Sequence, residues 1–157
     1  MNVLLVLAAC ISVCSAHLCM LSPPQRGSMN DINKKGANDC FLINKPCGGR
    51  PGSTNPLILK AGQNFTVTFQ KNLDHWVKAT PGYFSINWMD MTVSPMMTSQ
   101  LYKIADMGEP SLTLYSQNVT IPKTSKSGTS YILQTQYVTN NAKAPPVFYQ
   151  CSDITVA

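Results

Sequence analysis

The sequence predicts an all-β fold, an antiparallel β-sandwich of the immunoglobulin-like or fibronectin-like type. Apolar and polar residues alternate through several short segments, and this is the period of a half-buried strand. Pro, Gly and Asn separate the segments, and no long stretch has the period of a helix. Strands at such spacing, without helices between them, are typical of two packed antiparallel sheets.

Residues 21–56 are expected to form a long loop. They are rich in Pro, Gly, Asn and Ser, with Pro23-Pro24 and Cys47-Gly48-Gly49 as turn signals. A segment of this composition has few apolar residues with which to build a core of its own. We therefore expect disulfides to hold this N-terminal loop region.

The alternation begins after this loop. In 64–69 three apolar residues alternate with three polar ones, and a second alternating segment covers 83–89. Residues 98–106 are the one segment expected to form a short helix. The remaining expected strands are 112–115, 119–121, 130–138 and 147–156.

Residues 1–16 have the pattern of a secretory signal peptide, because an apolar run ends in small residues at Ala16. Cleavage after Ala16 would make His17 the first residue of a single mature domain, 17–157. No second long apolar run follows in the sequence. We therefore expect a secreted, extracellular protein without a transmembrane segment.

Four cysteines remain after residue 16, and an even number in an exported chain indicates two disulfides. Three pairings are open. We prefer Cys47 with Cys151, which would tie the N-terminal third to the last strand, and Cys19 with Cys40. Zinc is the competing interpretation, but the mature chain has no Cys-x-x-Cys pair.

Two acceptor sequons fit the same compartment, and we expect glycans at Asn64 and Asn118. The formal net charge of +5 is spread along the chain, with Lys34-Lys35 as the only adjacent basic pair. The chain has neither a basic arm nor an aromatic RNA-binding motif. We therefore expect no nucleic-acid partner.

The mature chain contains only two histidines, His17 and His75. An N-terminal histidine offers its α-amine and its imidazole to one metal ion, and nitrogen donors of this kind suit copper(II). A second imidazole, from His75, would complete a histidine brace of three nitrogens. His75 follows an expected strand, so it should lie at one end of the sandwich, where binding residues are common. The alternative is that His75 is an ordinary packed side chain beside Trp76.

A carboxylate is expected to take a further position on the metal. Asp153 follows Cys151 by two residues in an expected strand, so both side chains project to the same face. A disulfide at Cys151 would hold Asp153 rigidly, as suits a ligand. Asp74 is the rival, but a hydrogen bond to a ligand ring or a structural role is the better interpretation for it.

Several short motifs occur in an order that resembles a known family. They are His17, the segment 24–27 (PQRG), Pro46-Cys47-Gly48-Gly49, Asp74-His75-Trp76 and the closing segment 149–154 (YQCSDI). The chain resembles secreted copper-binding proteins related to lytic polysaccharide monooxygenases, the fungal copper-acquisition factors with animal relatives. The match spans nearly all of the mature chain, but only through these short motifs.

This resemblance implies an immunoglobulin-like β-sandwich that holds copper through His17, His75 and Asp153. It also implies copper uptake or handling, since the aspartate takes a position that oxidative enzymes usually leave to an aromatic ring. Fungal members commonly have a residue between the His and Trp that are adjacent here, and many carry a C-terminal lipid-anchor signal, which we do not expect here. The expected function is extracellular copper(II) capture or handling, with a copper transporter or a cell-surface glycan as the candidate partner.

Two other functions are open. A copper-dependent polysaccharide monooxygenase needs an open coordination position and a flat aromatic surface, for which Trp76, Tyr83, Phe148 and Tyr149 are the candidate rings. A metal-free structural or adhesive sandwich would make the position of His17 accidental. Neither a nucleophilic triad nor a pair of glycosidase carboxylates can be assembled.

Four methionines, at 89, 91, 96 and 97, cluster around Pro95. Thioethers are soft ligands that prefer Cu(I), so the cluster is a candidate for receiving reduced copper from the brace. The alternative is that these flexible side chains fill gaps in a core or loop.

Overall fold

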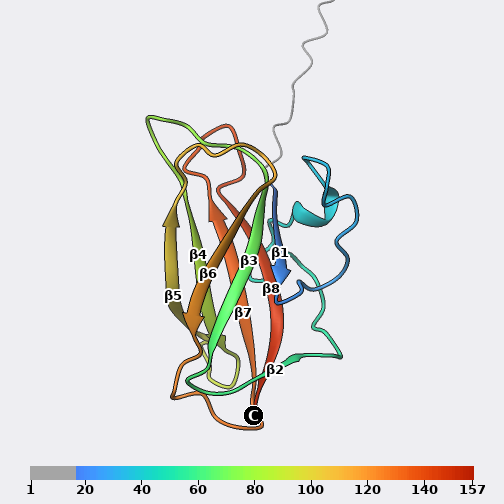
Figure 1. Ribbon diagram of the computed structural model, residues 1–157, viewed down its shortest axis with the longest axis vertical. Helices are drawn as coiled ribbons and strands as arrows, with labels where there is room; N and C mark the ends of the chain where they lie inside the picture. The colour runs from blue at the N-terminus through green and yellow to red at the C-terminus, as the bar shows by residue number, and fades with distance from the viewer. Residues whose placement is uncertain (1–16) are drawn as a thin grey trace, which may run out of the picture.

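The computed structural model describes residues 17–157 and shows a sandwich of two β-sheets (Figure 1). The smaller sheet has the order β1-β3-β6 and the larger one the order β2-β8-β7-β4-β5. Every neighbouring pair is antiparallel except β2 and β8, which are parallel. This confirms the predicted antiparallel β-sandwich. The strands are β1 (His17–Ser22), β2 (Leu57–Leu59), β3 (Asn64–Leu73), β4 (Tyr83–Asp90), β5 (Met97–Ala105), β6 (Thr113–Thr120), β7 (Ser130–Val138) and β8 (Val147–Val156).

The core lies between the two sheets and follows the alternation in the sequence. On β3, Val67 and Phe69 are buried, while Thr66 between them is exposed. The ring of Phe69 lies 5.3 Å from the ring of Phe84 on β4, so the two sheets meet through aromatic contacts. Burial of such rings is the main favourable contribution to packing the sheets together.

The prediction of a helix at 98–106 is wrong, because all of these residues except the last belong to the edge strand β5 (Met97–Ala105). The pairing of β4 with β5 shifts between Ile86 and Asn87, whose partners are Tyr102 and Gln100. The extra residue, Leu101, is a bulge that breaks the alternation. Leu101 and Ile104 therefore both pack against the core at a spacing of three, which resembles the spacing on a helix face.

Other strand boundaries also differ from the prediction. The separate strands expected at 112–115 and 119–121 are one strand, β6, because it pairs with β3 in unbroken register from Thr113 to Thr120. Strand β3 continues four residues beyond Phe69, to Leu73. The short strands β1 and β2 lie outside the predicted set. No helix within residues 17–157 has the length and apolar composition needed to cross a bilayer.

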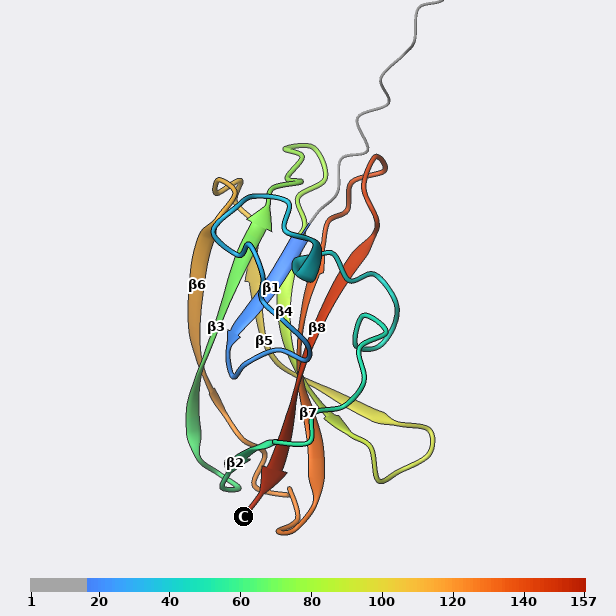
Figure 2. The same cartoon turned by 90° about the vertical axis from the view of Figure 1, so that its right-hand side faces the viewer.

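The long loop between β1 and β2 is held by two disulfides, as predicted. Its regular structure is one short 3-10 helix, η1 (Asn38–Cys40). Cys19 is bonded to Cys40, and Cys47 is bonded to Cys151, which is the preferred pairing. Figure 2 shows the loop beside β1 and β8. Backbone hydrogen bonds attach it there, from Arg26 N to Cys151 O at 2.7 Å and from Tyr149 N to Leu42 O at 2.8 Å.

The two sequons lie side by side on the smaller sheet, because Asn64 pairs with Thr120 and Thr66 pairs with Asn118. The hydroxyl of each threonine donates a hydrogen bond to the amide oxygen of the other sequon's asparagine, at 2.5 and 2.8 Å. All four residues are exposed. Glycans at Asn64 and Asn118 stay a prediction, and the position is compatible with them.

The two disulfides should differ in their contribution to stability. They close segments with sequence separations of 104 residues (Cys47–Cys151) and 21 residues (Cys19–Cys40). The longer closure restricts the unfolded chain more, so Cys47→Ala/Cys151→Ala should lower the free energy of unfolding by about 4–5 kcal/mol and Cys19→Ala/Cys40→Ala by about 3 kcal/mol. Denaturant unfolding of the two double variants measures this. The reverse order would contradict the loop-closure argument.

Candidate metal centre

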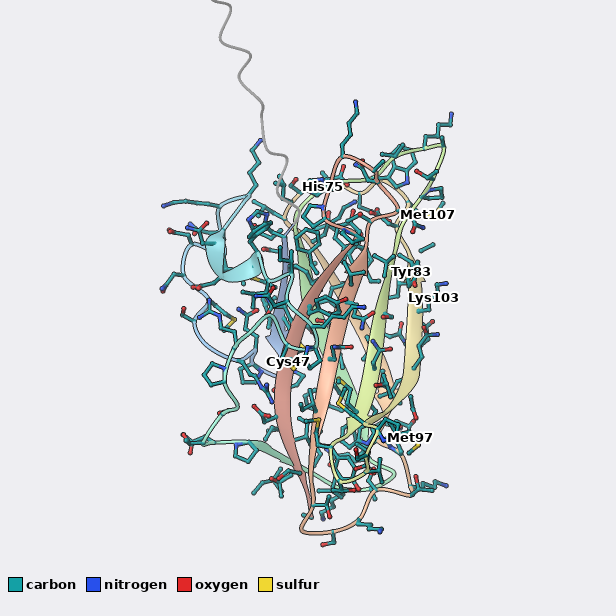
Figure 3. The ribbon with its side chains drawn as sticks, turned by 180° about the vertical axis from the view of Figure 1, so that it is seen from behind. Cys47, His75, Tyr83, Met97, Lys103 and Met107 are labelled. Atoms are coloured by element: carbon teal, nitrogen blue, oxygen red, sulfur yellow. A yellow bond between two sulfur atoms is a disulfide. The ribbon has the colours of Figure 1, made fainter. Side chains whose placement is uncertain are left out.

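The two histidines lie at the same end of the sandwich. His17 is the first residue of β1 and pairs with Leu73, the last residue of β3. His75 follows Leu73 by two residues, and Figure 3 shows it at this end of the molecule. Both side chains are buried. The antiparallel pairing of β1 with β3 therefore brings together two residues that are far apart in the sequence.

Aromatic rings connect the two imidazoles. The ring of His17 lies 5.2 Å from that of Phe41, and Phe41 lies 5.8 Å from Phe148. The ring of Phe148 in turn stacks on His75, at 6.4 Å with an interplanar angle of 17°. Phe41 belongs to the disulfide-held loop and Phe148 to β8. The loop and the last strand thus each place one aromatic ring beside one of the imidazoles.

The backbone of His75 is held at both of its polar groups. Its N–H donates to the hydroxyl of Tyr137 on β7, at 3.3 Å, and its carbonyl accepts from the side-chain amide of Asn141, at 3.0 Å. Tyr137 has no exposed surface. The position of His75 therefore depends on the β7 strand and on the loop that follows it.

A buried charge network lies beneath this backbone. Lys71 and Asp106 are both fully buried. The Lys71 ammonium donates to Asp106 Oδ1 at 2.6 Å and to the Glu109 carbonyl at 2.7 Å, and it forms an ion pair with Asp74. The Tyr137 hydroxyl donates to Asp106 Oδ2 at 2.6 Å. Burial, together with the hydrogen bond to Asp106, raises the pKa of Tyr137, so the hydroxyl stays protonated and keeps its role as a donor.

Sequence reasoning missed Lys71, Asp106 and Tyr137, although a signal for the first was present. Lys71 continues the core-facing alternation that runs through Val67 and Phe69. A charged residue at such a position needs a buried partner of opposite charge. Nothing in the spacing of the chain indicated that Asp106 would be that partner.

Asp74 has the structural role that the sequence favoured for it. Its carboxylate accepts from the backbone N–H of Trp76 at 2.9 Å, which closes a tight turn around His75. The Trp76 ring packs on Gly108, where a Cβ atom would lie 2.9 Å from a ring atom. Gly108 also has a φ of +85°, so both its conformation and its lack of a side chain fit this contact.

Asp153 is not brought to the histidines. Its carboxylate accepts from Arg26 Nε at 2.9 Å, from Arg26 Nη2 at 2.5 Å and from the backbone N–H of Ser53 at 2.7 Å. Asp153 lies five residues along β8 from Phe148, about 17 Å at the rise of a strand, and points to the opposite face of the sheet. Asp153 and the bridged Cys151 do project to the same face of β8, as expected. Phe148, whose ring stacks on His75, projects to the other face.

Among residues 17–157, no three His, Cys, Asp or Glu side chains are grouped to hold a metal ion. Two imidazoles at one end can bind a transition metal only with further donors, such as the α-amine of His17. The signal peptide expected at 1–16, and its cleavage after Ala16, lie outside the described residues.

Comparison with known families gives one match over almost the whole domain. The sequence model of the family described as "Copper acquisition factor BIM1-like" matches residues 15–157. A search of curated proteins found no match.

Solved structures with a similar fold include several polysaccharide monooxygenases. The catalytic domain of a lytic polysaccharide monooxygenase from Listeria monocytogenes is 17% identical, with 90% of this chain and 99% of that chain covered and a TM-score of 0.57. One from Cellvibrio japonicus, described as important for efficient utilization of chitin, is 12% identical, with 90% and 100% covered and a TM-score of 0.55. At such identities the likeness shows the fold alone.

Replacing Asp153 should change stability and leave metal binding intact. Burial opposes ionisation, but the hydrogen bonds from Arg26 and Ser53 and the Arg26 charge lower the pKa of Asp153 below its ordinary value of 3.8. The pair therefore stabilises the fold above about pH 4 and loses this contribution as the pH falls through the lowered pKa. We expect Asp153→Asn to lower the free energy of unfolding at pH 7 by about 2 kcal/mol, with a smaller difference at pH 3.

Denaturant unfolding at the two pH values and a copper(II) titration measure these effects. The control is Asp31→Asn, which removes an exposed ion pair with Lys34 and should change stability much less, because solvent screens an exposed pair. A large loss of copper affinity in Asp153→Asn would return Asp153 to the ligand set.

Replacing Tyr137 by Phe should affect both stability and the site. The change removes the hydroxyl that contacts Asp106 and the His75 backbone, so we expect a loss of about 2 kcal/mol in the free energy of unfolding and about tenfold weaker copper(II) binding. Tyr131→Phe is the matched control, because this buried hydroxyl on the same strand accepts only from the Lys126 backbone, at 2.8 Å. Equal copper affinities in the two variants would contradict the role given to Tyr137.

Proposed function

Because the chain belongs to the BIM1-like copper acquisition factor family, we propose that it captures or handles copper(II) outside the cell through His17 and His75. Signal cleavage after Ala16 would free the α-amine of His17. The ion would then meet three nitrogens: that amine and the two imidazoles. A copper transporter or a cell-surface glycan is the proposed partner for the bound ion.

One observation carries this proposal, the pairing of His17 with Leu73, two residues before His75. This pairing supports a shared site, because the two imidazoles lie at one end of the sandwich. Nitrogen donors of an amine and two imidazoles match the preference of copper(II). The apolar rings of Phe41 and Phe148 border the site, and such rings limit the access of water to the ion.

We propose a ligand set without Asp153. To reach the ion, this carboxylate would have to leave Arg26 and Ser53 and turn to the other face of β8. The aromatic ring beside His75 is that of Phe148. The open positions on the ion would then be taken by water or by a group from the partner that accepts it.

An oxidative function is the second candidate, and the position of Phe148 favours it. The family resemblance assigned one position beside the copper to an aspartate. In polysaccharide monooxygenases an aromatic ring usually takes this position. The rest of the surface does not favour a polysaccharide substrate. Phe148 and Tyr149 are buried, Trp76 packs on Gly108, and the Lys103 ammonium covers the Tyr83 ring at 3.8 Å. These four rings therefore do not form a flat exposed platform, and copper capture is the better interpretation.

The decisive experiment compares the mature protein, which begins at His17, with a form that retains Ala16. The two forms share every side chain of the domain, but the retained residue converts the amine into an amide. We expect one copper(II) per mature chain with three nitrogen ligands in the electron paramagnetic resonance spectrum, and binding weaker by about a hundredfold in the Ala16 form.

His75→Ala should lose a comparable share of the affinity. Equal binding by the mature and Ala16 forms would overturn the brace, and no binding by either would favour the metal-free sandwich. Steady peroxide production, or oxidised chitin or cellulose, with the copper-loaded protein would favour the oxidative alternative.

A further inference from the structure

We propose that the β4–β5 hairpin carries a second copper site, in which methionine sulfurs bind Cu(I). Four of the chain's eight methionines lie between residues 89 and 97. Strand β4 ends at Asp90 and β5 begins at Met97, so these four residues flank the turn of one hairpin. This site is independent of the nitrogen site and does not rest on the function proposed above.

Strand pairing and a surface hollow bring two of these methionines, Met89 and Met96, to one face. Asp90 pairs with Met97, and Met89 pairs with Thr98. Residues that pair directly across two strands project to the same face, so Met89 and Thr98 share one face of the hairpin. A hollow of about 490 Å³ is lined by Met89, Met96 and Thr98 together. Met91 and Met96 each lie one residue from the last pair of the hairpin, Asp90 with Met97, on the side of the turn.

The exposure of these side chains does not fit a packing role. Met91, Met96 and Met97 are 51%, 38% and 56% exposed, whereas methionine is usually among the buried residues. Met89 is buried against Ile132 and the Cys47–Cys151 disulfide. One sulfur is therefore anchored in the fold, and its neighbours at the tip are accessible to an ion from solvent.

The chemistry of the hairpin favours a soft monovalent ion. Thioether sulfur is a soft donor and prefers Cu(I) to copper(II). The hairpin, residues 83–105, contains one carboxylate, Asp90, and neither His nor Cys. Asp90 Oδ1 already accepts from the Thr92 N–H at 2.8 Å and from its hydroxyl at 2.6 Å. Hard metal ions thus find few donors there.

The hairpin tip lies far from the histidines. Figure 3 shows Met97 and His75 toward opposite ends of the sandwich. The sulfur site therefore cannot share an ion with the nitrogen site. The two sites would hold copper in different oxidation states.

The test is an anaerobic titration of the mature secreted protein with Cu(I), in competition with the chelator bicinchoninate. His75→Ala serves as the background, because it weakens the nitrogen site. We expect one Cu(I) per chain with sulfur neighbours in the X-ray absorption spectrum. Met91→Leu/Met96→Leu keeps the volume of the side chains and should weaken Cu(I) binding by at least about tenfold.

The matched control is Met29→Leu/Met107→Leu, which replaces two other exposed methionines, 39% and 73% accessible, away from the hairpin. This control should bind Cu(I) like the background protein. Equal binding by the two double variants would overturn the proposal, as would an absorption spectrum with only nitrogen or oxygen neighbours. The spectrum needs no methionine variant, so it decides the matter even if the hairpin variant fails to fold. Copper(II) titration of the mature protein separately tests the nitrogen site.

Discussion

The end of the sandwich that holds the histidines depends on the buried ammonium group of Lys71. A charge without exposed surface costs several kcal/mol unless its hydrogen-bonding capacity is met within the protein. An ammonium has three donors, and here they meet three acceptors: Asp106, the Glu109 carbonyl and Asp74. These acceptors belong to the loop before β6 and to the turn that contains His75. The requirement to satisfy one buried charge therefore fixes the loops around the site.

The network also connects the site to the rest of the fold. Asp106 uses one carboxylate oxygen for Lys71 and the other for Tyr137, whose hydroxyl in turn accepts from the His75 backbone. A displacement of His75 would thus disturb hydrogen bonds on β3, on β7 and in the loop between β5 and β6. Buried networks of this kind are strong when every member is satisfied, and they favour a single arrangement. A rigid backbone at His75 suits a residue that must meet a partner on another strand.

Local patterns were enough to predict the fold class, because alternation over a few residues reports which face of a strand is buried. These local patterns gave wrong predictions where the pairing between strands interrupts the alternation of apolar and polar residues. The bulge at Leu101 gives an edge strand the spacing of a helix, and the core position of Lys71 is explained only by Asp106, 35 residues later. The candidate site could be proposed from the sequence in part, because a chain with two histidines leaves few choices for a nitrogen site. The position of Asp153 was not, since its partner Arg26 is 127 residues away.

The two proposed sites lie toward opposite ends of the sandwich, so one small domain can offer two kinds of donor without interference. The nitrogen donors lie where β1 begins and β3 ends, and the sulfur donors lie at the turn between β4 and β5. Nitrogen donors stabilise copper(II), whereas thioethers stabilise Cu(I). An ion that leaves the nitrogen site as copper(II) would have to take one electron from an external reductant before the thioethers bind it as Cu(I). A protein with both sites could take up copper in either state from its surroundings, and the prevailing reductants would decide which end is loaded.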